Sequence, residues 1–306
     1  MRVALDAMGG DHAPLETVAG AVEAAAAGVD VVLVGDTDRI EPLCSEFGAD
    51  LQIVHAPDTV EMEEDPTRAM REKPDSSISV AARMVRDGDV DGLVSAGSTG
   101  AALTSSAITI GRIEGVLRPA IAAVIPSIPP TILIDAGANP AVGPKHLLQF
   151  ATMGVVTSEI VFGVEDPTVG LLSIGHEPGK GRALERLAAS LLAEAPFRFV
   201  GNVEGRDIPS GTVNVVVTDG FTGNVALKSL EGATSWIGSL AARAGGPLPE
   251  AVRHALDYEN TGGAHLVGVQ GVVIIAHGAS SRVAIRNALT MAVTSEGMVA
   301  EIGRRL

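Results

Sequence analysis

The sequence predicts an α/β protein built around a mostly parallel, Rossmann-like sheet, and two observations support this fold class. The hydrophobic share of 46% comes mainly from Ala, Val, Leu and Ile, with only 3% aromatic residues, which is typical of parallel strands covered by Ala-rich helices. Short apolar segments also alternate with helical patterns along the chain. The 306 residues can bury a large core, as one domain or as two lobes sharing a sheet. No repeat, linker or change of composition divides the chain, so we expect a single domain over 1–306, with a helical excursion at about 236–257.

Apolar runs and turn residues define the expected elements of the first 110 residues. Strands are expected at 2–6, 31–34, 51–55 and from Asp91, and helices after Pro14, over 38–47 and 76–85, and from Thr99. Cys44 is expected to pack on the inner side of the second helix. Burial is favoured over reactivity for this thiol, because Arg39 is its only basic neighbour within a helical turn.

The rest of the chain continues the alternation. Strands are expected at 121–124, 131–135, 169–174, 197–200, 213–218 and 271–276, and helices at 145–162, from Lys180, and at 224–244, 250–257 and 282–297. The helix at 145–162 has a broad apolar face, which favours burial between two elements or between subunits. The helix at 224–244 carries Trp236, Ile237, Leu240 and Ala241 along one side. A subunit contact is the favoured explanation, and a membrane-surface or partner contact is the alternative.

The first candidate for a ligand-binding turn is DGLVSAGSTGA at residues 91–101. It is typical of a buried strand that ends in a glycine turn opening a helix. Gly97 and Gly100 remove side chains where an anion would approach, and Ser95, Ser98 and Thr99 add hydroxyl donors beside the first amides of the helix. A tight turn with Ser98 or Thr99 as the N-cap explains the motif equally well.

Three further Gly-rich turns shift the balance toward a ligand site. They are AMGGDHAP, DAGANP and DGFTGN, and each follows an expected strand. Parallel strands end at the same edge of a sheet, where ligands bind in open α/β folds. We therefore expect the four turns to converge on one crevice.

Composition excludes several classes of protein. A net charge of −15 without a basic stripe argues against nucleic acid as a partner. The single cysteine excludes an internal disulfide framework, and the chain opens without the pattern of a signal peptide, so a cytoplasmic location is expected. Because no apolar run reaches the ~18 residues that span a bilayer, any membrane contact is expected to be peripheral.

Cofactor motifs are also missing. The acidic run at 61–65 contains no His or Cys and predicts a solvated loop rather than a metal site. GHEPGKG departs from the nucleotide P-loop in spacing and lacks its Ser or Thr, and no dinucleotide fingerprint or GxSxG motif is present. Chemistry on an anionic substrate, with no cofactor and no metal, is the economical interpretation.

Several long strings carry a resemblance to a known family. In order, they are LDAMGGDHAP, DGLVSAGSTGA, GRIEGVLRPAIA, LIDAGAN, NVEGRDIPSG, VVVTDGFTGNVALK and GVVIIAHGASS. They closely resemble the bacterial phosphate acyltransferases of phospholipid synthesis, over almost the whole chain. Members of that family convert acyl-(acyl-carrier-protein) and inorganic phosphate into acyl phosphate and free carrier.

The resemblance implies more than the residues themselves do. It implies a three-layer α/β/α sandwich related to phosphotransacetylases and isocitrate dehydrogenase-like enzymes, a homodimer, and delivery of acyl phosphate to a membrane glycerol-phosphate acyltransferase. It also implies peripheral contact with the inner face of the cell membrane. This chain departs from the family at Ser98, where Asn is usual, and in the short stretch 236–257, which puts the strength of membrane docking in doubt.

On this basis the candidate site residues receive roles. Phosphate is the nucleophile, so no covalent residue is required, and the protein supplies positioning and electrostatics. The expected phosphate-binding residues are Gly9, Gly10, Asp11, Ser95, Gly97, Ser98, Thr99 and Gly100. The expected catalytic residues are Lys180 for charge compensation, Asn224 for the thioester carbonyl, and His277 for the departing thiolate.

Each role has a plainer alternative. Lys180 is equally well explained as an exposed lysine at a helix start, and a lone histidine after an apolar strand, such as His277, is more often structural. Asp219 is expected to fix a turn rather than transfer a proton. Arg68, Arg71 and Lys73 form the candidate contact for the acidic carrier protein, with a solvated loop as the alternative.

Two other functions compete with the acyltransferase. A non-catalytic carrier-binding or membrane-organising protein would tolerate alanine at Lys180 and Asn224. A dehydrogenase of similar architecture would need a nucleotide pocket and a metal carboxylate cluster, and the sequence shows neither clearly.

Overall fold

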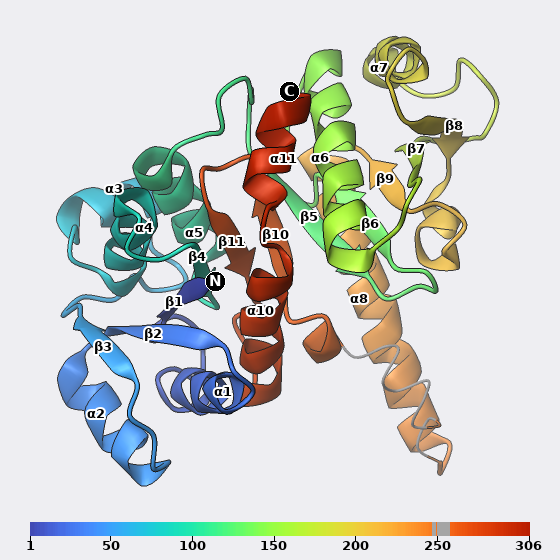
Figure 1. The fold of residues 1–306 in the computed structure, drawn as a ribbon. Coiled ribbons are helices and arrows are strands. Elements are labelled where there is room, and N and C mark those ends of the chain that lie inside the picture. Colours follow the sequence, from blue (N-terminus) through green and yellow to red (C-terminus); the bar gives the residue numbers. More distant parts are fainter. Residues whose placement is uncertain (247–248, 250–257) are drawn as a thin grey trace. The chain divides into compact units, whose positions relative to one another are not determined.

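The computed structural model describes residues 1–246, 249 and 258–306, and they form two compact units (Figure 1). Unit 1 comprises Met1–Glu114 and Thr261–Ala300, and unit 2 comprises Gly115–Asn260 and Glu301–Leu306. Each unit is described by itself. Whether the chain behaves as a single domain stays a prediction.

The sheet of unit 1 is mostly parallel. Its strand order is β3 (Gln52–His55), β2 (Asp30–Gly35), β1 (Arg2–Asp6), β4 (Gly92–Ser95), β11 (Val272–Ile275) and β10 (Ala264–Val267). All neighbouring strands are parallel except β10, which runs antiparallel to β11. The central strands are almost fully buried, as the apolar runs of the sequence indicate. The sequence reasoning missed β10.

Helices flank this sheet in the sequence order that we expected, except for α3 (Pro66–Glu72), which we expected to be part of a loop. They are α1 (Leu15–Ala26), α2 (Thr37–Glu46), α3 (Pro66–Glu72), α4 (Ser77–Asp87), α5 (Thr99–Ser105) and α10 (Arg282–Thr294), and a π-helical turn, η1 (Ser106–Ile110), continues α5. Helix α1 packs closely on α10, where a Cβ at Gly20 would lie 2.7 Å from the carbonyl oxygen of Arg282. The buried position of Cys44 on α2 is confirmed.

Unit 2 has its own mostly parallel sheet. Its strand order is β5 (Ala120–Ile125), β6 (Thr131–Ile134), β9 (Val215–Val217), β7 (Thr168–Leu172) and β8 (Arg198–Val203). Only β5 is antiparallel to its neighbour β6 within this order. The helical elements are α6 (Pro144–Phe162), α7 (Ala183–Ala193), η2 (Gly205–Ser210), α8 (Gly220–Arg243) and η3 (Tyr258–Asn260). A final helix, α11 (Met298–Arg305), ends the chain.

The core of unit 2 lies between its sheet and the helices that pack on it. Helix α6 is buried along much of its length, which confirms the long apolar helix expected at 145–162. A Cβ at Gly154 would lie 2.6 Å from the side chain of Val215. The absence of a side chain at Gly154 therefore lets α6 pack closely on strand β9. Leu133 and Val216 belong to a buried cluster against which Leu227 of α8 packs.

Three expected helix boundaries were wrong. The helix expected from Lys180 begins only at Ala183, because Gly179 and Gly181 adopt φ values of +89° and +98°, which a right-handed helix cannot contain. The helix expected at 282–297 ends at Thr294, and an unexpected helix begins at Met298, just after Gly297, where φ is +84°. The helix expected from Asn224 already begins at Gly220.

Part of the expected helical excursion is described. Helix α8 continues to Arg243, so the first part of the 236–257 stretch is helical, and Trp236, Ile237 and Leu240 are 65%, 45% and 44% exposed. The helix expected at 250–257 lies outside the described residues. Within the part of the chain that is described, no helix combines the length and hydropathy needed to cross a membrane.

Candidate functional site

The turns after β1 and β4 meet in unit 1. Asp6 and Ser95 lie opposite each other at the ends of these parallel strands. The hydroxyl of Ser95 donates a hydrogen bond to Oδ2 of Asp6 over 2.7 Å, and the amide of Gly97 donates to Oγ of Ser95 over 3.1 Å. A Cβ at Gly9 would lie 2.5 Å from Oδ2 of Asp6 and 2.8 Å from the amide nitrogen of Gly97. Only glycine therefore allows the two turns to approach this closely.

The turn after β11 joins them. The amide of Asp11 donates to the carbonyl oxygen of Gly278 over 2.8 Å, and Gly10 has a φ of +116°. His277 precedes Gly278, and its Nδ1 accepts a hydrogen bond from the amide of Ala279 over 3.2 Å. Neutral His277 therefore carries its proton on Nε2. The exposed imidazole and the expected Gly9–Asp11 residues thus belong to neighbouring turns of one unit.

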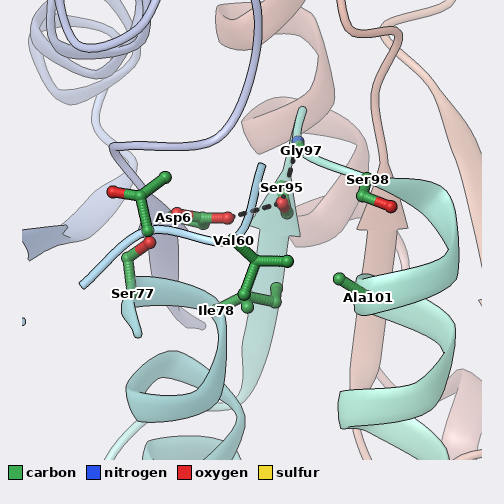
Figure 2. A pocket seen from close by; sticks show the side chains of 9 residues that line it. Asp6, Val60, Ser77, Ile78, Ser95, Gly97, Ser98 and Ala101 are labelled. Carbon is green, nitrogen blue, oxygen red and sulfur yellow. Dashed lines mark hydrogen bonds between the residues drawn. The ribbon is translucent and has the colours of Figure 1, made fainter. Parts of the chain in front are cut away.

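A small pocket opens beside these turns (Figure 2). Its lining residues are Asp6, Thr59, Val60, Ser77, Ile78, Ser95, Gly97, Ser98 and Ala101. Ser98 is the N-cap residue of α5, but its side chain makes no capping hydrogen bond, and it is 8% exposed at the pocket wall. The following Thr99 is exposed and Gly100 packs on Pro66. Ser98 therefore has a hydroxyl to offer, whereas the N-cap explanation lacks its hydrogen bond.

Asp6 is the pocket residue that the sequence reasoning missed. Its side chain is 3% exposed, and Oδ1 has no hydrogen-bond partner among the described residues. Burial raises the pKa of Asp6, and the hydroxyls of Ser77 and Ser95 with the amides of Met8 and Gly9 lower it only in part. The signal was present in LDAMGG, where one carboxylate ends an otherwise apolar strand.

The turns of unit 2 are organised by another buried carboxylate, Asp135. Its Oδ1 accepts from the amides of Ile121, Gly137 and Ala138, and its Oδ2 accepts from the amide and the side-chain nitrogen of Asn139. The backbone carbonyl oxygen of Asn139 accepts a hydrogen bond from the amide of Gly220 over 2.8 Å. The turn after β6 is thereby fastened to the turn after β9.

Asp219 fixes the start of α8, as the sequence predicts. It accepts from the amide and the hydroxyl of Thr222, each over 2.9 Å, and from the guanidinium of Arg182. Burial opposes ionisation of Asp219, but these donors together hold its pKa below the usual value. Arg182 also pairs with Glu185, and these two carboxylates, Glu185 first, raise the pKa of the guanidinium. The sequence reasoning missed Arg182, whose charge is largely compensated here.

Lys180 and Asn224 also lie in unit 2. Lys180 is exposed in the loop before α7, and its ammonium makes no ion pair or side-chain hydrogen bond with a described residue. Asn224 is exposed on the first turn of α8, where its Nδ2 donates to the carbonyl oxygen of Ala136 over 3.3 Å. A Cβ at Gly137 would lie 2.9 Å from that Nδ2, so the amide covers the DAGAN turn. Its second N–H and its oxygen stay available.

The four Gly-rich turns therefore gather as two groups, one in each unit. The turns that begin at Ala7 and Ala96 meet in unit 1, and those that begin at Asp135 and Asp219 meet in unit 2.

The candidate carrier contact is only partly open. Arg68 pairs with Glu72 over 2.9 Å, and Lys73 pairs with Glu64 over 2.5 Å while donating to the carbonyl oxygen of Thr59 over 2.8 Å. Arg71 is exposed and forms no ion pair with a described residue. Neighbouring carboxylates thus offset two of the three cations.

Comparisons with known proteins place these features in context. A family model described as "Fatty acid synthesis protein" matches residues 1–299. The phosphate acyltransferase of Heliobacterium modesticaldum is 47% identical over 95% of this chain and 93% of its own length. The phosphate acyltransferase of Desulfitobacterium hafniense is 44% identical over 100% of this chain and 98% of its own.

Solved structures confirm the fold class. A phosphotransacetylase from Streptococcus pyogenes covers 97% of this chain and 94% of its own with a TM-score of 0.67 at 17% identity. EutD phosphotransacetylase from Staphylococcus aureus covers 96% and 94% with a TM-score of 0.63 at 20% identity. The expected relation to phosphotransacetylase architecture is correct.

Proposed function

This chain belongs to the fatty acid synthesis protein family and is an acyltransferase like its phosphate acyltransferase relatives, and we propose that it transfers a fatty acyl group from acyl-(acyl-carrier-protein) to inorganic phosphate. The product is acyl phosphate for phospholipid synthesis. The structural observation that supports the proposal best is the close approach of the Gly9 and Gly97 turns, which gathers their amides beside the Ser95 hydroxyl. Such groups suit an oxyanion.

The reaction proceeds by direct attack of phosphate. A phosphate oxygen forms a bond to the thioester carbon, charge develops on the carbonyl oxygen, and the carbon–sulfur bond then breaks to release the carrier thiolate. Cys44 does not suit a covalent mechanism, because its thiol is buried on the inner side of α2 and burial raises its pKa. Catalysis then rests on positioning and on electrostatic stabilisation of the developing charge.

The residues divide into phosphate-binding and catalytic groups. Gly9, Gly10, Asp11, Ser95, Gly97, Ser98, Thr99 and Gly100 are assigned to phosphate. Lys180 compensates charge through its unpaired ammonium, and Asn224 offers its second amide N–H to the carbonyl oxygen. His277, with its proton on Nε2, donates that proton to the departing thiolate.

The proposed partners follow from the same assignment. Arg68, Arg71 and Lys73 contact the acidic carrier protein, and Arg71 is the one of the three that no described carboxylate pairs with. A second copy of the chain completes a homodimer, and a membrane glycerol-phosphate acyltransferase receives the product. The enzyme works in the cytoplasm with peripheral contact at the inner face of the membrane, for which the exposed apolar side of α8 is available.

The test is thiol release from a long-chain acyl-(acyl-carrier-protein), with and without inorganic phosphate. Wild-type protein is expected to release thiol only with phosphate and to form acyl phosphate. Lys180→Ala and Asn224→Ala are each expected to lower kcat by ~10²–10³, the usual effect of removing one donor to a developing charge.

Lys228→Ala is the matched control, because Lys228 is an exposed lysine on α8 that pairs with Glu231. It is expected to keep wild-type activity. Full activity in both Lys180→Ala and Asn224→Ala would remove their catalytic assignment. A folded wild-type protein that binds the carrier but never releases thiol would favour the non-catalytic binding protein instead.

A further inference from the structure

The loop that carries Lys180 is held against β8 and η2 of unit 2. In this loop, Nε2 of His176 lies 2.7 Å from Oδ2 of Asp207. One residue further on, the carbonyl oxygen of Glu177 accepts a hydrogen bond from Nδ2 of Asn202 over 3.0 Å. The loop between β7 and α7 is therefore anchored by side chains from the segment that follows α7 in the chain.

Asp207 is an ionised acceptor in this contact. Its Oδ2 also accepts the amide hydrogen of Glu204 over 2.8 Å. This amide and the imidazole of His176, the amide first, hold the pKa of Asp207 below its usual value, although burial opposes them. Because an ionised carboxylate can only accept, Nε2 of His176 carries a proton and donates it in a charge-assisted hydrogen bond.

The side chain of Lys180 lies against the same part of the loop. A Cβ at Gly175 would lie 3.4 Å from Cγ and 3.6 Å from Cδ of Lys180. The amide of Lys180 donates to the carbonyl oxygen of Glu177 over 3.2 Å. The stem and the backbone of the lysine thus contact the two residues on either side of His176.

The backbone around Lys180 has little stiffness of its own. Gly179 and Gly181 flank the lysine with φ values of +89° and +98°, in a region that glycine enters and leaves freely. After the lysine, a guanidinium N–H of Arg186 donates to the carbonyl oxygen of Gly181 over 2.6 Å. Before it, the side-chain anchor is His176. The two anchors together hold both ends of a flexible segment.

We propose that the His176–Asp207 pair is a positioning device for Lys180, which keeps the lysine ammonium where negative charge develops during acyl transfer. The inference rests on the proposed function, in which Lys180 compensates that charge. A lysine side chain has many rotamers, and electrostatic stabilisation requires a charge that is already in place. His176 and Asp207 therefore act through the lysine and are not themselves catalytic residues.

The first test is the rate of phosphate-dependent thiol release by His176→Ala. The imidazole is 50% exposed, so its loss is expected to leave the protein folded. We expect kcat to fall about tenfold, because a misplaced charged group loses transition-state stabilisation. The KM for the acyl carrier is expected to stay unchanged, because Lys180 is assigned to the transition state rather than to carrier binding.

A double-mutant cycle separates positioning from a merely structural role. If His176 acts through the lysine, His176→Ala causes no further loss of kcat in a Lys180→Ala protein. A structural role would lower kcat by the same factor in both backgrounds, and that result would overturn the proposal.

A conservative variant and a control complete the experiment. Glutamine can donate an N–H to Asp207, so His176→Gln is expected to recover most of the kcat that His176→Ala loses. His55→Ala is the matched control, because His55 is an exposed histidine of unit 1 that contacts Thr37. It is expected to keep the wild-type kcat. Loss of the same size in His55→Ala would overturn the proposal.

Failure of the inference and failure of the proposed function give different results. Wild-type kcat in a folded His176→Ala protein, together with a large loss in Lys180→Ala, would remove the positioning role and leave the reaction and its lysine in place. Thiol release that does not depend on phosphate would remove the reaction itself, and the inference with it.

Discussion

Asp6 of unit 1 and Asp135 of unit 2 occupy similar places and have opposite surroundings. Each lies at the carboxyl end of a buried strand or one residue beyond it, and each is at most 3% exposed. Asp135 accepts hydrogen bonds on both oxygens from surrounding amides. Asp6 accepts a hydrogen bond from Ser95 on Oδ2, and the Ser77 hydroxyl and the Met8 and Gly9 amides also favour its charged form, yet burial still raises its pKa.

The two carboxylates differ in how many hydrogen-bond donors the surrounding turns hold against them. The amides around Asp135 are fixed by the turn that it holds, so nothing further can bind to it. The number of donors, rather than burial or sequence context, therefore distinguishes the two carboxylates.

Replacing the two carboxylates by alanine tests this comparison most strongly. Asp135→Ala leaves several buried donors without an acceptor and is expected to lower the free energy of unfolding by about 3–5 kcal/mol or to prevent folding. Asp6→Ala leaves the hydroxyls of Ser77 and Ser95 without this acceptor and is expected to lower the free energy of unfolding by less, about 1–2 kcal/mol. Urea unfolding of both variants measures this, and equal losses would break the comparison.

Glycine substitutions give a smaller effect at the same two places. A Cβ at Gly223 would overlap the backbone carbonyl oxygen of Asp135, whereas one at Gly9 meets the side-chain oxygen of Asp6 and the Gly97 amide. Gly223→Ala is expected to lower the free energy of unfolding by about 3 kcal/mol and Gly9→Ala by about 1–3 kcal/mol.

Gly232 on α8 provides the control, because a Cβ there meets no atom within 4 Å. Gly232→Ala is expected to raise the free energy of unfolding by about 0.5–1 kcal/mol, since alanine favours a helix. Thermal unfolding ranks the three variants. A Gly9→Ala protein less stable than Gly223→Ala would show that the unit 1 turns are the more rigid.

The dependence of stability on pH gives the smallest effect, and its sign differs between Asp6 and Asp219. The pKa of Asp6 is raised in the folded state, so folding takes up a proton above about pH 4. The contribution of Asp6 to the free energy of unfolding therefore falls as pH rises above about 4. The pKa of Asp219 is lowered in the folded state, so its contribution is present above about 4 and is lost as pH falls below it.

Asparagine variants at both positions isolate these contributions. The stability advantage of wild-type protein over Asp6→Asn should shrink between pH 4 and pH 8, and its advantage over Asp219→Asn should shrink below pH 4. Each unit of pKa difference corresponds to roughly 1.4 kcal/mol. Urea unfolding across this range supplies the measurement, and the same sign for both variants would contradict the contrast.

The sequence predicted most elements and all four glycine turns, though not their division into two groups, for reasons that are local. Buried parallel strands are continuous apolar runs, and the glycines at positions 9, 97 and 137 follow them directly. It did not predict β10, whose four residues AHLV are too short to show a period. The start of α7 was misplaced, because a positive φ at Gly181 depends on the turn that Arg182 and Glu185 complete.

The candidate site was harder to predict than the turns around it. Asp6 and Ser77 are 71 residues apart in the chain, and only the sheet topology brings the first strand beside the start of α4. The pairing of Lys73 with Glu64 likewise depends on how a loop folds back. Ionisation and hydrogen-bond partners are properties of such non-local contacts, so a residue list from the sequence cannot supply them.

The sequence contains a single cysteine, and that residue, Cys44, lies buried on the inner face of α2. A thiol reagent can reach it only when α2 moves away from the sheet, and burial also disfavours the reactive thiolate. The rate of labelling of native protein therefore reports how often this part of unit 1 opens. The same labelling experiment with added phosphate would show whether binding at the end of β1 slows the local opening of α2, which follows the neighbouring strand β2. It needs no engineered probe.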